Sequence, residues 1–206
     1  MIRGKFITLE GGEGVGKTTN LAFIKSCLEQ YKVTVTLTRE PGGTELAEKL
    51  RQLLLNKDGE AISEQAELLM IFAARAQHIK HVIEPALAKG NWVLCDRFTD
   101  ATYAYQGGGR NINRCSIEWL ENLVQKKLKP DLTILLDAPI EIGLARAKKR
   151  ANLDRFESEK TIFFEQVRQS YLFQAAQYPE RIKLIKADQP LTLVQNELAE
   201  IIETFF

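Results

Sequence analysis

The chain has 206 residues, of which 45% are hydrophobic and 27% are charged, and this composition is typical of one globular domain over residues 1–206. The formal net charge of +1 argues against a nucleic-acid or membrane-surface partner. The three cysteines form no metal-ligand or redox spacing, so we expect free thiols in a reducing compartment. With no signal peptide and no apolar run of membrane-spanning length, a cytoplasmic protein is expected.

Apolar runs alternate with helical patterns along the chain. The expected elements, in chain order, are strands at Lys5–Glu10, Val33–Arg39, Trp92–Asp96, Leu132–Asp137 and Ile182–Lys186, and helices at Lys17–Gln30, Thr44–Leu55, Ser63–Ala88, Ser116–Lys127, Ile140–Arg150, Glu159–Gln177 and Leu191–Phe205. Pro85 should kink or end the long third helix near Glu84. This alternation predicts an α/β fold, with a five-stranded parallel sheet and helices on both faces.

Residues 11–18 read Gly-Gly-Glu-Gly-Val-Gly-Lys-Thr and match the phosphate-loop pattern G-x-x-x-x-G-K-[ST]. Glycines let backbone N–H groups close around phosphate oxygens, and the following helix points its N-terminus at the anion. Lys17 would bring its charge to the β- and γ-phosphates, and the Thr18 hydroxyl would bind Mg²⁺. The predicted ATP-binding residues are Gly11, Gly12, Glu13, Gly14, Val15, Gly16, Lys17, Thr18 and Thr19.

Three further segments interrupt the core pattern. Pro41-Gly42-Gly43 follows the second strand, and Gly107-Gly108-Gly109-Arg110 lies beyond the third. Ligands of open α/β sheets bind beyond the carboxyl ends of the strands, where both segments are expected to lie. The third segment, residues 141–156, carries a basic cluster and is expected to form a short lid over that site; its cations are Arg146, Lys148, Lys149, Arg150 and Arg155.

The third strand ends in Asp96-Arg97. A carboxylate at this edge can hold Mg²⁺ directly or through water, and the arginine can pair with phosphate oxygens of an acceptor. The alternative is a surface ion pair at a strand end. A switch GTPase would need N-K-x-D, but Asn56-Lys57-Asp58-Gly59 has its aspartate one position early. A small domain with an arginine-rich segment late in the chain favours a nucleotide kinase.

The order of these motifs resembles bacterial thymidylate kinase from the first strand to the last helix. The matching segments are Gly11–Thr18, Thr38-Arg39-Glu40-Pro41-Gly42-Gly43-Thr44, Asp96-Arg97-Phe98 with Ala104-Tyr105-Gln106-Gly107, and Leu153-Asp154-Arg155. The resemblance implies the P-loop nucleotide kinase fold and transfer of the γ-phosphoryl group of ATP to dTMP, with Mg²⁺. It also implies a homodimer, and the product dTDP belongs to dTTP biosynthesis.

The resemblance further implies roles for single residues. Arg75 would reach the thymine carbonyl, while Thr102 and Gln106 would read the base edge. Tyr105 would crowd the 2′ position of the sugar. The predicted dTMP-binding residues are Glu13, Arg39, Glu40, Arg51, Phe72, Arg75, Arg97, Thr102, Tyr105 and Gln106. Many relatives carry a stacking aromatic four residues before the base-reading arginine. Ile71 occupies that position here, so either Phe72 turns into the pocket or an aliphatic side chain covers the base.

Phosphoryl transfer depends on positioning and charge neutralisation, because the acceptor oxygen is already ionised near pH 7. Some thymidylate kinases place an arginine inside the phosphate loop, where this chain has Gly14. The lid is therefore expected to supply the cation, with Arg150 first and Arg146 and Arg155 next. The predicted catalytic residues are Lys17, Arg97, Arg150, Glu13, Arg146 and Arg155. Two alternatives remain, a kinase for another nucleoside monophosphate and a nucleotide-dependent switch ATPase.

Overall fold

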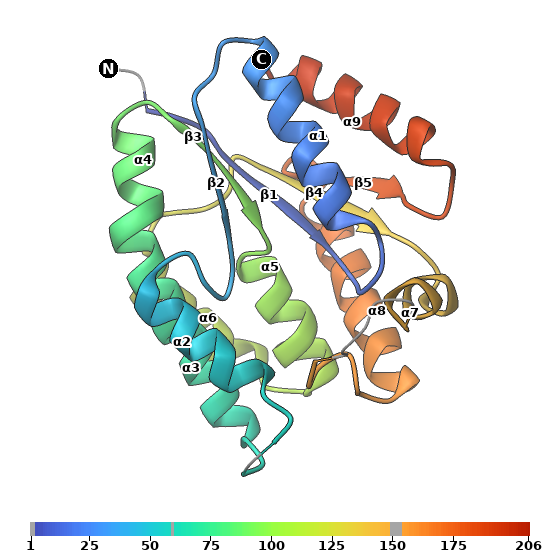
Figure 1. The fold of residues 1–206 in the computed structure, drawn as a ribbon. Helices are drawn as coiled ribbons and strands as arrows, with labels where there is room; N and C mark the ends of the chain where they lie inside the picture. Colours follow the sequence, from blue (N-terminus) through green and yellow to red (C-terminus); the bar gives the residue numbers. More distant parts are fainter. Residues whose placement is uncertain (1–2, 59, 149–153) are drawn as a thin grey trace.

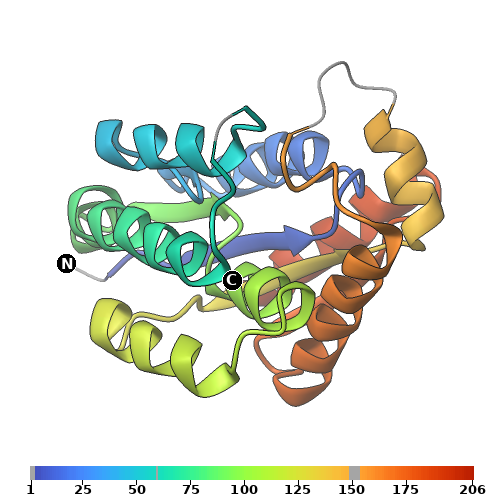
Figure 2. The same cartoon turned by 90° about the horizontal axis from the view of Figure 1, so that it is seen from below.

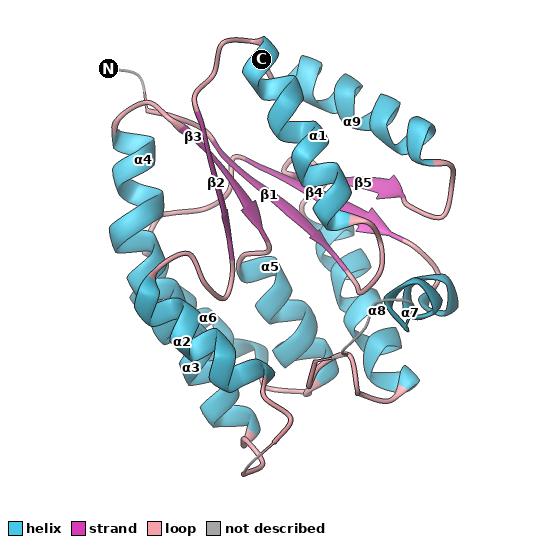
Figure 3. Ribbon diagram, viewed as in Figure 1, coloured by secondary structure: helices cyan, strands magenta, loops and turns pink. Residues whose placement is uncertain are grey.

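The computed structural model describes residues 3–58, 60–148 and 154–206. Its five strands form one parallel sheet in the order β2-β3-β1-β4-β5 (Figure 1). The strands are β1 (Phe6–Gly11), β2 (Val35–Arg39), β3 (Trp92–Asp96), β4 (Leu132–Asp137) and β5 (Ile182–Lys186). Parallel strands end at one edge, which Figure 3 shows by the direction of the arrows. Asp96 pairs there with Leu9 on one side and Arg39 on the other.

Helices cover both faces of the sheet, as Figure 2 shows from below. They are α1 (Lys17–Gln30), α2 (Glu45–Leu55), α3 (Glu64–His78), α4 (Glu84–Ala88), α5 (Thr99–Thr102), α6 (Arg114–Gln125), α7 (Ile140–Lys148), α8 (Thr161–Gln177) and α9 (Leu191–Phe205). Helices α1 and α9 pack on one face through residues such as Ile24 and Leu198. Helix α8 and the end of the α3–α4 segment pack on the other, through Val167 and Ile83. This two-sided burial explains the nearly continuous apolar strands.

The five strands and seven long helices predicted from the sequence are confirmed in the described residues, with boundaries shifted by two residues at most except within the third helix and at the masked end of α7. In place of a kink near Glu84, a π-helical turn, η1 (Ile79–Ile83), joins α3 to α4. Pro85 then stands in the first turn of α4, where a missing N–H breaks no helical hydrogen bond. None of the helices in the described part of the chain is long and apolar enough to cross a membrane.

The glycine-rich segment beyond the third strand is helical. The segment Tyr103–Gly109 forms a second π-helical stretch, η2, that continues directly from α5. Helix α8 packs closely against it, and a Cβ at Gly108 would lie 2.8 Å from the backbone oxygen of Gln166. Its glycines therefore permit close helix packing. Of the expected lid, residues 141–148 belong to α7, whereas residues 149–153, including Arg150, lie outside the described residues.

Candidate active site

A cavity of about 510 Å³ opens at the carboxyl edge of the sheet, between the loop that follows β1 and the segment from α2 to α3. Seventeen of the predicted site residues line it: Glu13, Gly14, Val15, Gly16, Lys17, Thr18, Thr19, Arg39, Glu40, Arg51, Arg75, Asp96, Arg97, Thr102, Tyr105, Gln106 and Arg146. Gly11, Gly12, Phe72 and Arg155 are not among its lining residues. Fold topology thus gathers side chains that are up to 133 residues apart into one volume.

The phosphate loop holds its lysine through two of its own carbonyl groups. Lys17 Nζ donates to the carbonyl oxygens of Gly11 and Gly12, at 3.1 and 2.8 Å. Burial, reinforced by the charge of Arg97, lowers the pKa of Lys17 to about 8, against the opposing effect of Glu13 and other carboxylates. The ammonium group is therefore poorly compensated, and an anion at the N-terminus of α1 would stabilise it.

Gly14 and Gly143 explain why this loop carries no arginine. Gly14 has a φ of 68°, which is favourable for glycine. A Cβ at Gly14 would collide with the backbone oxygen of Gly143 in α7, and a Cβ at Gly143 would collide with the backbone oxygen of Glu13. Because the two backbones touch, no side chain fits between the loop and α7.

Asp96 has the character of a metal ligand. It ends β3 beside Lys17 in the cavity wall, and its Oδ1 is buried with no hydrogen-bond partner among the described residues. A buried carboxylate oxygen without a donor is costly unless something binds it. Thr18, in the first turn of α1, lines the same cavity with an exposed side chain. This donor set of carboxylate and hydroxyl oxygens suits Mg²⁺.

Arg97 lines the cavity and has a strained backbone conformation, with a φ of 67°. Its Nη2 donates to Glu13 Oε1 at 2.8 Å and to the Tyr105 hydroxyl at 2.9 Å. Its Nη1 donates to the Tyr171 hydroxyl at 3.0 Å. Tyr105 also donates to Glu13 Oε1, at 2.7 Å. Three groups from separate elements, Glu13, Tyr105 and Tyr171, therefore fix the position of the guanidinium.

Glu10 and Tyr171 support Arg97 and were missed by the sequence interpretation. Tyr171 donates to Glu10 Oε2 at 2.8 Å, and the Phe98 N–H, directly after Arg97, donates to Glu10 Oε1 at 2.6 Å. Burial and the nearby charge of Asp100 raise the pKa of Glu10 to about 8. A charged residue inside an apolar strand was the available signal, since such residues are rarely buried without a function.

Arg75 is almost fully buried in α3. Its Nε donates to Glu40 Oε2 at 2.7 Å, and its Nη2 donates to the Thr102 hydroxyl at 2.9 Å. His78 Nδ1 lies 2.9 Å from the other oxygen of Glu40. Nη1 of Arg75 is buried and has no partner among the described residues, so one strong donor remains to be satisfied.

Phe72 is not among the residues that line the cavity, and its predicted contact with dTMP stays a prediction. Its ring packs with Ile117 and Leu120 of α6, and the Arg75 guanidinium lies 4.8 Å above the ring centre. Ile71 lines the cavity instead. Phe72 therefore supports the arginine through a cation–π contact.

The three other predicted arginines differ in their surroundings. Arg39 pairs with Glu48 at 2.8 Å, and Arg51 donates to the Pro41 carbonyl at 3.0 Å. Arg146 donates to the Ala187 carbonyl at 3.0 Å and lines the cavity.

Arg155 is held by residues of α2 and α3, and the catalytic role predicted for it stays a prediction. Its Nη2 donates to Glu67 at 2.6 Å, and its Nε donates to the Leu54 carbonyl at 2.7 Å. Its donors are thus directed to α2 and α3.

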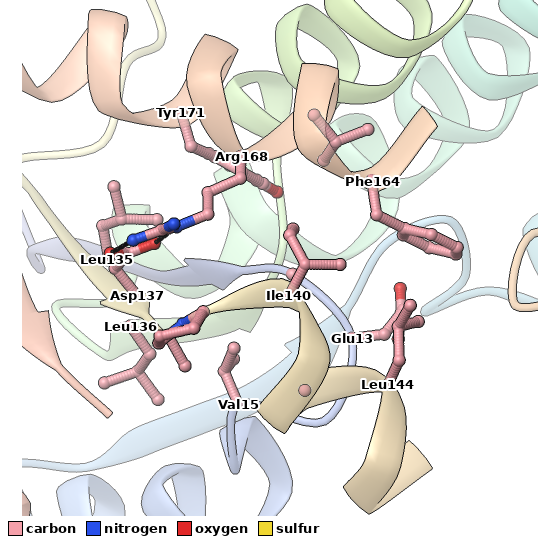
Figure 4. A pocket seen from close by; sticks show the side chains of 15 residues that line it. Glu13, Val15, Leu135, Leu136, Asp137, Ile140, Leu144, Phe164, Arg168 and Tyr171 are labelled. Atoms are coloured by element: carbon pink, nitrogen blue, oxygen red, sulfur yellow. Dashed lines mark hydrogen bonds and ion pairs between the residues drawn. The ribbon is translucent and has the colours of Figure 1, made fainter. Parts of the chain in front are cut away.

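A second cavity, of about 20 Å³, lies behind the phosphate loop between β4, α7 and α8 (Figure 4). Most of its lining is apolar, including Leu136, Ile140 and Phe164. Arg168 and Asp137 form a bidentate ion pair at its wall, with distances of 2.7 and 2.8 Å. This space is large enough for about one water molecule and too small for a nucleotide.

A model of the thymidylate kinase family matches residues 9–198. The chain belongs to the thymidylate kinase family. It is 54% identical to thymidylate kinase of Alcanivorax borkumensis over 200 residues, covering 97% of this chain and 96% of that protein. It is 56% identical to thymidylate kinase of Teredinibacter turnerae, covering 98% of each. The crystal structure of thymidylate kinase from Ehrlichia chaffeensis matches with a TM-score of 0.77 and 31% identity, covering 97% of this chain and 99% of that one. The fold is that of P-loop nucleotide kinases, and family membership identifies an ATP-dependent phosphotransferase.

Proposed function

We propose that this protein phosphorylates dTMP with ATP and releases dTDP and ADP, on the route to dTTP. The observation that carries this proposal is one cavity with two chemically different ends. At one end lies the phosphate loop, and at the other lies the unpartnered Nη1 donor of the buried Arg75. A carbonyl oxygen of thymine is a suitable acceptor for that donor. The family relationship favours the same substrates.

The donor end is formed by residues 11–19. Loop N–H groups and the N-terminus of α1 would surround the triphosphate, and Lys17 would exchange the loop carbonyls for the β- and γ-phosphates. We propose Mg²⁺ as the cofactor, held by Thr18 and by Asp96, directly or through water. When bound, the ion neutralises charge on the β- and γ-oxygens.

The acceptor end would hold the three parts of dTMP separately. Arg97 and Arg51, with Arg39 at the rim, would bind the acceptor phosphate. Tyr105 and Glu13 would border the sugar. Arg75, Thr102 and Gln106 would read the base edge, and Ile71 would cover the base face in place of an aromatic ring.

The transferred phosphoryl group develops charge that the phosphate loop alone does not neutralise. Because Gly14 has no side chain, a cation must come from another segment. We propose Arg146 for this role, since it lines the cavity from α7. The role predicted for Arg150 stays a prediction, because that residue lies outside the described part of the chain.

We also propose that residues 1–206 act as one kinase domain and that two copies form a homodimer in the cytoplasm. Helix α3 exposes Leu69, and helix α6 exposes Trp119 and Leu123, one turn apart. Large exposed apolar side chains on two contacting helices are typical of a protein interface. Sedimentation velocity of the wild type and of a Trp119→Glu variant would test the dimer.

A coupled assay of ADP release with a panel of nucleoside monophosphates tests the function. We expect dTMP to give the highest kcat/KM. A higher value with dCMP or dGMP would favour another monophosphate kinase. ATP binding without transfer to any acceptor would favour a switch ATPase.

A further inference from the structure

We propose that Glu67 is a positioning residue that selects the pyrimidine base. It holds the Gln106 side chain with the carbonyl oxygen toward the cavity, which favours a base that carries N3–H, as thymine does. Cytosine, whose N3 is an acceptor, would face that oxygen without a hydrogen bond. This inference rests on the proposed function and concerns the base pocket of the same site.

The contact between the two residues fixes the direction of the amide. Gln106 Nε2 lies 2.8 Å from Glu67 Oε1, and the two residues are 2% and 1% exposed. A carboxylate accepts hydrogen bonds only, so the NH₂ group of Gln106 must face it. The side-chain oxygen of Gln106, Oε1, accepts no hydrogen bond from the described residues, and Gln106 lines the cavity.

Two arginines keep Glu67 an acceptor on both oxygens. Arg155 Nη2 donates to Oε2 at 2.6 Å, and Arg110 donates to Oε2 at 3.3 Å and to Oε1 at 3.4 Å. Every partner of this carboxylate is therefore a donor. No group at Glu67 can donate to the amide oxygen of Gln106, and a reversed amide would bring two oxygens together.

Gln106 and Arg75 together present a complementary pattern. The unpartnered Nη1 of Arg75 is a donor, whereas the outward atom of Gln106 is an acceptor. Thymine offers the opposite pair on adjacent atoms, with acceptor O4 and donor N3–H. Cytosine reverses both, so each of the two contacts discriminates against it. Glu67 never touches the base, yet it sets one half of this pattern.

Glu67→Gln is the direct test, because a carboxamide at residue 67 can donate as well as accept and so permits the Gln106 amide to reverse. We expect the ratio of kcat/KM for dTMP to that for dCMP to fall by about tenfold, the effect of one hydrogen bond. Glu159→Gln is the matched control. It removes the other carboxylate partner of Arg110, at 2.6 Å, and should leave the ratio unchanged.

A double-mutant cycle with Gln106→Met separates positioning from a structural role. That background has no amide to orient, so adding Glu67→Gln should not alter the ratio further. The proposal is overturned if Glu67→Gln lowers kcat/KM for dTMP and for dCMP by the same factor. It is also overturned if Glu67→Gln alters the ratio of the two values as much in the Gln106→Met background as in the wild type.

Two variants keep the test decisive if Glu67→Gln does not fold. Gln106→Met should lower the ratio of kcat/KM for dTMP to that for dCMP. Glu67→Asp retains a carboxylate and should preserve this ratio, even if both kcat/KM values fall. An unchanged ratio in Gln106→Met, or a narrowed one in a folded Glu67→Asp, contradicts the proposal. A wild-type protein that phosphorylates dCMP but not dTMP would refute the proposed function itself, before any variant is compared.

Discussion

Arg75 and Glu40 form an ion pair of 2.7 Å between side chains that are only 2% and 3% exposed. Removing one partner of such a pair leaves a buried charge without compensation, which costs stability as well as function. Glu40 also contacts His78, so the carboxylate organises two side chains of α3 at once. Variants in this part of the base pocket must therefore retain a cation.

Arg75→Lys keeps the charge but loses the planar fork that contacts Glu40 and Thr102 and leaves Nη1 for the base. We expect KM for dTMP to rise by about tenfold or more, while KM for ATP stays nearly constant. Steady-state kinetics with each substrate varied would measure both constants, and a thermal melt would check folding. A larger effect on KM for ATP than on KM for dTMP would mean that the ATP and dTMP ends of the cavity have been assigned the wrong way round.

Lys17 should give ATP use a pH dependence. Burial lowers the pKa of Lys17 to about 8, so without ligand the ammonium is charged below pH 8 and neutral above it. ATP requires the charged form, and we expect kcat/KM for ATP to fall by about tenfold per pH unit above pH 8.

Lys17→Arg is the control for this titration, because a guanidinium keeps its charge throughout. Its activity should be lower, but the decline above pH 8 should disappear. Glu10, whose pKa is raised into the same range by burial, still titrates in that variant. A decline that persists in Lys17→Arg would therefore point to Glu10.

Tyr105 combines a ring that can exclude a 2′-hydroxyl with a hydroxyl that joins Glu13 to Arg97. Tyr105→Phe should preserve the preference for dTMP over its ribonucleotide analogue and lower kcat severalfold. Tyr105→Ala should narrow that preference, because the ring is lost. Competition between the two acceptors, followed by product analysis, would measure selectivity. Equal selectivity in all three proteins would assign sugar discrimination to another residue.

Asp96→Asn tests the metal site, since it retains shape but removes the charge of the unpartnered oxygen. We expect half-saturation by Mg²⁺ to require about tenfold more metal. Asp137→Asn is the matched control, because Asp137 also ends a strand but pairs with Arg168 (Figure 4). Activity titrated with Mg²⁺ at fixed ATP would distinguish them. Equal Mg²⁺ requirements in both variants would exclude Asp96 as a ligand.

Gly143→Ala should lower activity through the phosphate loop, although residue 143 belongs to α7. The added methyl group would meet the backbone oxygen of Glu13 and displace the loop. We expect KM for ATP to rise by severalfold. Ala145→Ser serves as the comparison, because residue 145 belongs to the same helix and is exposed. An unaltered KM in Gly143→Ala would show that α7 moves without effect on the loop.

Local sequence carried the information for some features and not for others. The phosphate loop was predictable because its ligand groups are contiguous, and the strands were predictable because their apolar residues are consecutive. The support of Arg97 by Glu10 and Tyr171 was not predictable from local sequence. The hydrogen bond between Tyr171 and Glu10 links residues that are 161 positions apart. Ile71 and Phe72 show a detail that local sequence does not decide. Adjacent helical residues differ by about 100° in direction, and only tertiary packing decides which one reaches the cavity.

The touching backbones of Gly14 and Gly143 also restrict how this enzyme can change over generations. An arginine in the phosphate loop at residue 14 would require a side chain that α7 excludes. Moving α7 away would withdraw Arg146 from the cavity. An arginine at residue 14 and the present position of α7 are therefore mutually exclusive. The packing of α7 thus couples two features of the cavity, the absence of a side chain at residue 14 and the presence of Arg146 in the wall.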